Sequence, residues 1–251
     1  MGLARAEDSI EGIRAAAQIV ARVLAELGNV VRPGVTTAEL DAVAERLIRE
    51  SGGRPAFKGY RGFPAAICTS INEEVVHGIP GKRALREGDI IGIDVGVERN
   101  GWYGDAARTF EVGAVSPEAS RLVRVTAEAL EKGLAEARAG KRVGDISHAV
   151  QSHVEQSGFS VVRDLVGHGI GREMHEEPAV PNFGLPGKGP RLVVGQVLAI
   201  EPMVNAGGRG VETRRDGWTV VTRDGRWSAH FEHTVAVGPD GPEILSASPD
   251  E

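Results

Sequence analysis

Five residues with metal-binding side chains lie in segments that are otherwise apolar or rich in glycine. These residues are Asp94, Asp105, His168, Glu201 and Glu232. A buried, ionised carboxylate loses its hydration, so it needs a cation or several hydrogen-bond donors close by. The four carboxylates and one neutral imidazole balance the charge of two divalent ions and leave room for a bridging hydroxide. We therefore predict a dinuclear metal site that performs chemistry.

The expected ligands are oxygen atoms and one nitrogen, with no sulfur. Co²⁺, Mn²⁺, Fe²⁺ and Zn²⁺ all accept such ligands, so the sequence leaves the identity of the two ions open. Two ions of this kind activate a shared water and polarise a carbonyl, which favours hydrolysis at neutral pH. The ordinary alternatives are two aspartates exposed to solvent and a histidine that serves only the fold of its glycine-rich loop.

The segment 90–110 is predicted to form a β-hairpin that carries two of the carboxylates on one face. Asn100-Gly101 is a strong signal for a two-residue turn between paired strands. Such a turn pairs residues whose numbers sum to 201, so Asp105 lies opposite Gly96 and diagonal to Asp94 on one face. A three-residue loop would break this parity and point the two aspartates to opposite faces.

The surrounding pattern predicts two similar halves within one domain, residues 1–251. Apolar residues recur at helical spacing over 9–28, 37–50, 117–137 and 143–156. Strand-like runs cover 65–70, 90–97, 104–112, the region of Val161, 193–200, 219–222 and 231–237. A shift of 106 places residues 32–34 on 138–140 and residues 51–52 on 157–158. We predict a duplicated α+β fold, with halves of about 1–115 and 116–251 and a crevice on the face away from the helices.

Composition excludes several classes of function. The net charge of −6 is spread along the 251 residues without a basic patch, so direct binding of nucleic acid is not expected. The single cysteine, Cys68, rules out an internal disulfide and favours a buried free thiol. Neither a secretory signal nor a long apolar stretch is present, so we expect a soluble, cytoplasmic protein that does not bind a membrane.

Six features in a consistent order resemble the bacterial form of type I methionine aminopeptidase. They are residues 70–80 (SINEEVVHGIP), the Asp94 and Asp105 pair, 167–171 (GHGIG), 175–178 (HEEP), 200–203 (IEPM) and 231–234 (FEHT). The resemblance implies the duplicated pita-bread fold, with an antiparallel sheet, helices on its outer face and a dinuclear metal site in the central crevice. It also implies removal of the initiator methionine from nascent chains whose second residue is small, by attack of a metal-bridging hydroxide on the methionine carbonyl.

The resemblance further implies a role for each matching residue. Asp94 would bind one metal through both oxygens, Asp105 and Glu232 would bridge the pair, and His168 and Glu201 would complete the second metal. Glu201 would also carry the proton from water to the leaving amine. Two histidines outside the ligand set, His77 and His175, would contact the substrate and stabilise the tetrahedral intermediate. The other histidines, His148, His153, His230 and His233, receive no role.

The matching methionine pocket is apolar. Its residues would be Tyr60, Phe63, Cys68, Met174 and Trp218, whose types suit a thioether side chain. Met174 departs from the aromatic residue that bacterial members often carry before the matching histidine, which leaves the shape of the pocket open.

Two other functions remain as alternatives. Xaa-Pro aminopeptidases and prolidases share the fold and the metal chemistry, but they usually carry an extra N-terminal domain and lack the HEEP motif. Inactive binding proteins of the fold typically lack several metal ligands, whereas all five are present here. The expected partners are the N-terminal Met peptides of nascent chains, with transient proximity to the ribosome, and the chain is expected to act as a monomer.

Overall fold

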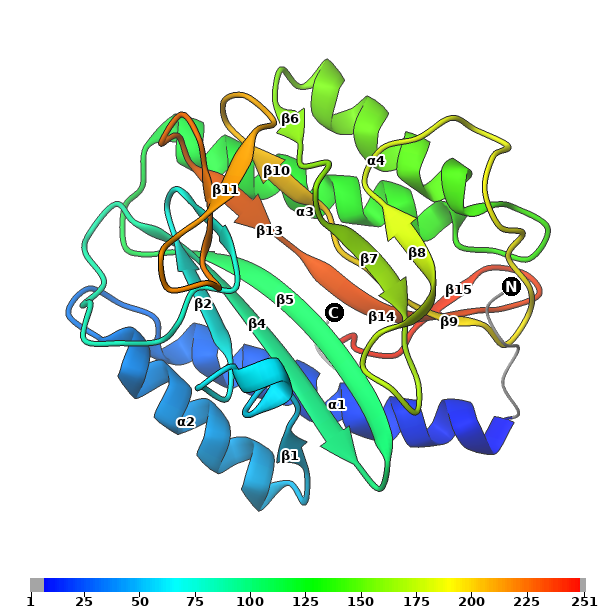
Figure 1. Ribbon diagram of the computed structural model, residues 1–251, viewed down its shortest axis with the longest axis horizontal. Helices are drawn as coiled ribbons and strands as arrows, with labels where there is room; N and C mark the ends of the chain where they lie inside the picture. The colour runs from blue at the N-terminus through cyan, green and yellow to red at the C-terminus, as the bar shows by residue number, and fades with distance from the viewer. Residues whose placement is uncertain (1–6, 249–251) are drawn as a thin grey trace.

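The computed structural model describes residues 7–248 and contains four long helices around a central sheet (Figure 1). The helices are α1 (Glu7–Val30), α2 (Thr37–Glu50), α3 (Pro117–Glu136) and α4 (Val143–Gln156). All four predicted helices are therefore confirmed, within a few residues at their ends. In Figure 1, α1 and α2 lie along one end of the molecule, and α3 and α4 lie along the other. None of the helices within residues 7–248 is long and apolar enough to cross a membrane.

Local sequence signals account for the starts of two helices. The hydroxyl of Thr36 accepts a hydrogen bond from the Glu39 N–H, and the Glu39 carboxylate accepts one from the Thr36 N–H. This capping box satisfies N–H groups that have no partner within the first turn of α2. Helix α3 begins with Ser116 as its cap and Pro117 at its first position, where a missing N–H costs nothing.

A nine-stranded sheet joins the two halves of the chain. Its order is β1-β4-β5-β14-β9-β7-β8, with β2 also paired to β4 and β15 to β14. These strands are β1 (Arg54–Pro55), β2 (Cys68–Ile71), β4 (Ile90–Arg99), β5 (Trp102–Glu111), β7 (Val166–Gly169), β8 (Glu176–Pro181), β9 (Val197–Ile200), β14 (Glu232–Val237) and β15 (Pro242–Ile244). All of their recorded pairings are antiparallel, which confirms the predicted α+β class. The central strand β14 pairs with β5 of the first half and β9 of the second.

Two small sheets flank the main one. The first has the order β13-β10-β6, from β6 (Ser160–Val161), β10 (Met203–Asn205) and β13 (Ser228–His230). The second has the order β11-β12-β3, from β3 (Glu74–Val76), β11 (Val211–Thr213) and β12 (Val220–Thr222). A short 3-10 helix, Tyr60–Gly62, precedes β2.

Two predicted strands begin later than expected. The strand predicted over 193–200 is present only as β9, because residues 193–196 form a turn in which the Gln196 N–H donates to the Val193 carbonyl. Gly195 has a φ of 82° in this turn, which suits glycine. The strand predicted over 65–70 begins at Cys68, because the N–H groups of Ala66 and Ile67 bind the Asp41 carboxylate instead of another strand.

The helices attach to the sheet through separate apolar clusters. Ile19, Leu27 and Leu40 of α1 and α2 pack against Ile93 of β4. On the other side, Leu130 of α3 and Ile146 of α4 pack with Leu198 of β9. Each of these side chains is at most 3% exposed, so both attachments are well packed. The strands that carry the predicted ligands are consequently held in place from both ends of the molecule.

Candidate metal centre

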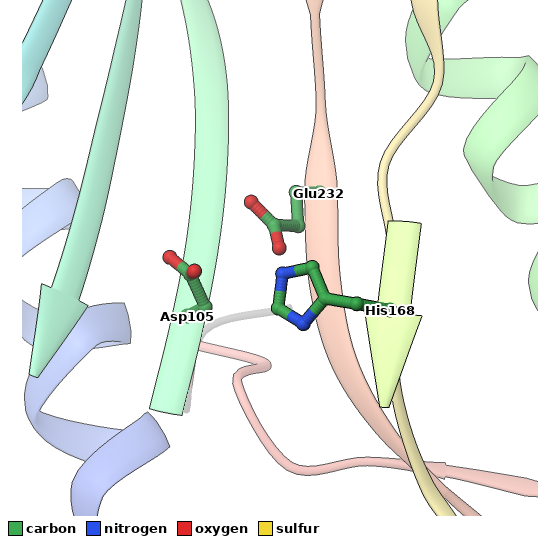
Figure 2. A group of neighbouring side chains, drawn as sticks. All are labelled: Asp105, His168 and Glu232. Atoms are coloured by element: carbon green, nitrogen blue, oxygen red, sulfur yellow. The ribbon is translucent and has the colours of Figure 1, made fainter. Parts of the chain in front are cut away.

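The five predicted ligands meet in one cavity. They come from five chain segments: Asp94 from β4, Asp105 from β5, His168 from β7, Glu201 from the residue after β9, and Glu232 from the start of β14. All five line a cavity of about 310 Å³. Figure 2 shows Asp105, His168 and Glu232 directed toward one another from three strands. One candidate ligand atom from each of these three lies within 4.8 Å of the other two.

The predicted hairpin register is confirmed. Asp105 pairs with Gly96 and Asp94 pairs with Ala107, so the paired numbers sum to 201 as expected. The turn residues Asn100 and Gly101 have φ values of 53° and 77°, which are the left-handed values of a tight two-residue hairpin turn. Both aspartates therefore lie on one face of the sheet.

Long-range pairing adds Glu232 to the same face. Ala107 pairs with Asp94 on one side and with Glu232 on the other, so these three residues form a row across β4, β5 and β14. Residues directly opposite one another in a sheet point to the same face. Ala107 therefore lies between the two carboxylates, and its side chain is small enough to leave space between them.

Several carboxylate oxygens in the cluster have no hydrogen-bond partner among residues 7–248. They are Asp94 Oδ1, Asp105 Oδ1 and Glu232 Oε1, and all three atoms are buried. Burial raises the pKa of Asp94 to about 7. The pKa of Asp105 is raised well above its usual value, first by burial and then by the neighbouring charges of Glu232 and Asp94. Such unpartnered, mutually repelling acids are stable only with protons or cations, so this donor set fits divalent metal ions.

The remaining two predicted ligands, Glu201 and His168, also have shifted pKa values. Burial raises the pKa of Glu201 and Glu232 well above the usual value for Glu, and nearby acids add to the effect. Burial lowers the pKa of His168 to about 4, so its imidazole is neutral. The Nδ1 of His168 lies 2.9 Å from the Gly169 carbonyl, which can only accept a hydrogen bond. The proton is therefore on Nδ1, and the lone pair on Nε2 is free to bind a metal.

The two predicted non-ligand histidines also line the cavity. Burial is the main cause of a lowered pKa at both His77 and His175. The ring of His175 lies 4.3 Å from the ring of His168 between centroids, and the Tyr60 hydroxyl lies 3.0 Å from its Nδ1. His77 has a φ of 60°, which is uncommon for a residue other than glycine. Strained backbone of this kind is often found at functional sites.

Four of the five predicted pocket residues line the cavity. These are Tyr60, Phe63, Cys68 and Trp218, and Phe63 and Trp218 meet edge to face with centroids 5.1 Å apart. Phe57 and Met203 are further apolar lining residues that the sequence analysis did not name. Cys68 is the expected buried free thiol, and burial raises its pKa well above the usual value.

The fifth predicted pocket residue, Met174, packs against other residues of the predicted pocket. It is buried in a cluster with Phe57, Phe63 and Cys68, and it is absent from the described residues that line the cavity. Its methyl group instead lies against Gly96 of β4, close to where a Cβ atom would be. Because Gly96 lies opposite Asp105, Met174 packs on the same face of the sheet as Asp94 and Asp105.

One histidine without an assigned role lies beside the site. The Nε2 of His230 is buried without a hydrogen-bond partner and is 3.7 Å from Glu201 Oε2. Burial, with a smaller effect from His77, lowers the pKa of His230 to about 3. His230 ends β13 and Glu232 begins β14, so the spacing of two along the chain did not by itself identify this neighbour.

Comparisons with known proteins agree with this geometry. Residues 11–239 match the sequence profile of Metallopeptidase family M24. A methionine aminopeptidase of Clostridium perfringens is 55% identical over 240 residues, which covers 96% of each chain. The crystal structure of methionine aminopeptidase from Thermotoga maritima has a TM-score of 0.97 and 46% identity, covering 99% of this chain and 100% of that one. The prolidase from Pyrococcus horikoshii shares the fold, with a TM-score of 0.81 and 21% identity. The matched region covers 99% of this chain and 64% of the prolidase chain. The chain therefore belongs to metallopeptidase family M24.

Proposed function

We propose that this protein is a methionine aminopeptidase that removes the initiator methionine from nascent chains whose second residue is small. The observation that carries the proposal is a group of buried acids, with unpartnered oxygens, at one side of a cavity with apolar walls. Relatives that share about half of its residues over nearly the full length are named for this activity. The Xaa-Pro alternative is supported only by the shared fold.

The ligand roles form part of the proposal. Asp94 would hold one divalent ion, Asp105 and Glu232 would be shared between two, and His168 and Glu201 would hold the other. When bound, the two ions would lower the pKa of a shared water and polarise the scissile carbonyl. The identity of the ions among Co²⁺, Mn²⁺, Fe²⁺ and Zn²⁺ is left to experiment.

Three side chains would handle protons and developing charge. Glu201 reaches the cavity, and burial, with a smaller effect from Asp94 and Asp105, raises its pKa, so it can take up a proton from water and return it to the leaving amine. His77 and His175 are neutral near pH 7 and can donate an N–H to the carbonyl oxygen as negative charge develops there. Donors that are already in position are effective because they need no reorganisation during the reaction.

The apolar walls would select the first residue of the substrate. Tyr60, Phe63, Cys68 and Trp218 surround the part of the cavity that suits an unbranched thioether side chain. The preference for a small second residue follows from the resemblance to the family. We further propose that the whole chain is a single catalytic domain with two pseudo-symmetric halves. It would act as a monomer in the cytoplasm, with only transient proximity to the ribosome.

The proposal is tested with metal-free protein that is reloaded separately with Mn²⁺, Fe²⁺, Co²⁺ or Zn²⁺. The substrates are the peptides Met-Ala-Ser, Met-Leu-Ser and Ala-Pro-Ser, and release of the first amino acid is measured. We expect methionine from Met-Ala-Ser only, and no release by the Asp105→Ala variant. The Asp240→Ala variant is a matched control, since Asp240 is an exposed aspartate in a loop. Cleavage of Ala-Pro-Ser would indicate the prolyl specificity, and no cleavage with any metal would contradict the proposed function.

A further inference from the structure

The backbone of His230 is fixed at the edge of the metal centre. This residue ends β13, is 3% exposed, and lies two positions before Glu232. Its N–H donates to the Thr109 hydroxyl at 2.9 Å, and the same hydroxyl donates to its carbonyl oxygen at 2.8 Å. Thr109 belongs to β5, the strand that carries Asp105. The position of His230 is therefore tied to one of the strands that carry the ligands.

The side chain of His230 is directed at one specific oxygen. Its Nε2 is 3.7 Å from Glu201 Oε2, while His168 Nε2 is 3.6 Å from Glu201 Oε1. The Glu201 carboxylate therefore lies between two imidazoles. Because Nδ1 of His168 donates to the Gly169 carbonyl, its Nε2 presents a lone pair to Glu201. Of these two rings, His230 is the one that can offer an N–H.

A purely structural role does not account for this arrangement. The Nε2 of His230 is buried and has no hydrogen-bond partner in the part of the chain that the structure describes, which is costly for a polar group in a protein interior. An apolar side chain of similar size would fill the same space without that cost. The backbone carbonyl of Glu201 is held by the Asn182 side chain at 3.1 Å, but that bond leaves the carboxylate free to turn.

We propose that His230 is a positioning residue, whose Nε2–H donates to Glu201 Oε2 and fixes the orientation of that carboxylate. This inference rests on the proposed function, because it matters for the proton transfer assigned to Glu201. The present separation is longer than a hydrogen bond, and a small rotation of either side chain closes it. Hydrogen bonds at active sites are often long before the substrate binds.

The first test compares His230→Gln with His230→Met. These two side chains have similar length and flexibility, but only glutamine has an N–H donor. At saturating metal, we expect the Met variant to lose about 10–100-fold in kcat with KM almost unchanged, as for other residues that orient metal ligands. The Gln variant should recover most of that loss. A Met variant as fast as the unchanged protein would overturn the proposal, as would a Gln variant as slow as the Met variant.

A matched control uses a second histidine of the same chain segment. His233 lies three positions further on, and its Nδ1 is 2.9 Å from the Ser246 hydroxyl. We expect His233→Met to keep kcat within about twofold of the unchanged protein. A loss as large as that of His230→Met would show that the effect comes from a general disturbance of the segment 230–233.

The second test does not depend on activity. Long-range proton–nitrogen NMR spectra of the full-length protein report which ring nitrogen of each histidine carries the proton, before and after Zn²⁺ is added. The signal of His230 is the one missing in His230→Gln. We expect the Nε2–H form in both states, and the Nδ1–H form would overturn the proposal. If methionine release fails with every metal, the proposed function is wrong. The NMR result still tests whether Nε2 of His230 carries the proton that it would donate to Glu201.

Discussion

The hydroxyl of Tyr60 lies 3.0 Å from Nδ1 of His175, and the two rings stack with centroids 5.4 Å apart. When the hydroxyl donates to Nδ1, the proton of the neutral imidazole is on Nε2. In the proposed function, Tyr60 would thus form part of the cavity wall and also select the donor nitrogen of His175. This contact joins the 3-10 helix Tyr60–Gly62 to the segment between β7 and β8.

Removing only this hydroxyl should slow the reaction. Tyr60→Phe keeps the ring, so we expect KM for Met-Ala-Ser to change little and kcat to fall about 10-fold or more. Steady-state kinetics at saturating metal measure both values. Tyr103→Phe is the matched control, because Tyr103 is the other tyrosine of the chain and lies outside the cavity lining. An unchanged kcat in Tyr60→Phe would show that Tyr60 serves only as a wall.

The metal-free protein should lose stability as the pH rises. The pKa of Asp94 in the folded state is raised to about 7, so folding favours its protonated form. This contribution is fully present below the unfolded pKa of about 4, and it is lost as the pH rises through about 7. The expected slope is about 1.4 kcal/mol per pH unit for each carboxylate that titrates. Urea unfolding of metal-free protein at several pH values between 4 and 8 measures it.

The variant Asp94→Asn serves as the control for this titration. We expect its metal-free form to be more stable than the unchanged protein at pH 8, by ~2 kcal/mol or more, because a buried negative charge is removed. The same variant should bind less metal. A stability that is independent of pH in the unchanged protein would contradict the raised pKa.

The small side chain at position 107 should be necessary for metal binding. Ala107 lies between Asp94 and Glu232 in one row of the sheet, so Ala107→Leu would fill the space between the two carboxylates. We expect the bound metal, measured by elemental analysis after dialysis, to fall well below that of the unchanged protein. Ala107→Gly leaves the space open and should keep its metal, at a cost of about 0.5–1 kcal/mol in stability. Full metal content in Ala107→Leu would show that the row is not part of the site.

Substitution of Met174 should affect stability more than specificity. Met174 packs against Phe57 and Gly96 and is not among the described residues that line the cavity, so Met174→Leu, which conserves volume, should keep kcat/KM within a few-fold. Met174→Ala should lower the free energy of unfolding by about 2–5 kcal/mol through the cavity it leaves. The matched variant Phe63→Ala changes a lining residue and should raise KM for Met-Ala-Ser. A change of specificity in Met174→Leu would place Met174 in contact with substrate.

Features that depend on neighbours along the chain could be predicted from the amino-acid sequence. Helical spacing defined α1 to α4 within a few residues, because an amphipathic pattern is local. The Asn100-Gly101 turn set the register of β4 and β5, so Asp94 and Asp105 could be placed on one face before any coordinates were known. The unfavourable burial of ionised acids identified Glu201 and Glu232 as residues that need a partner.

Features that depend on pairing between distant segments could not be predicted from local sequence patterns. The pairing of β14 with β5 connects residues more than a hundred positions apart, and no local periodicity encodes which residues of the two strands meet. That pairing places Ala107 between Asp94 and Glu232. The approach of His230 to Glu201 likewise requires β13 and the end of β9 to meet in space. A sequence pattern indicates which face of its helix or strand a residue occupies. The packing of the whole chain determines how close residues of distant segments lie to one another.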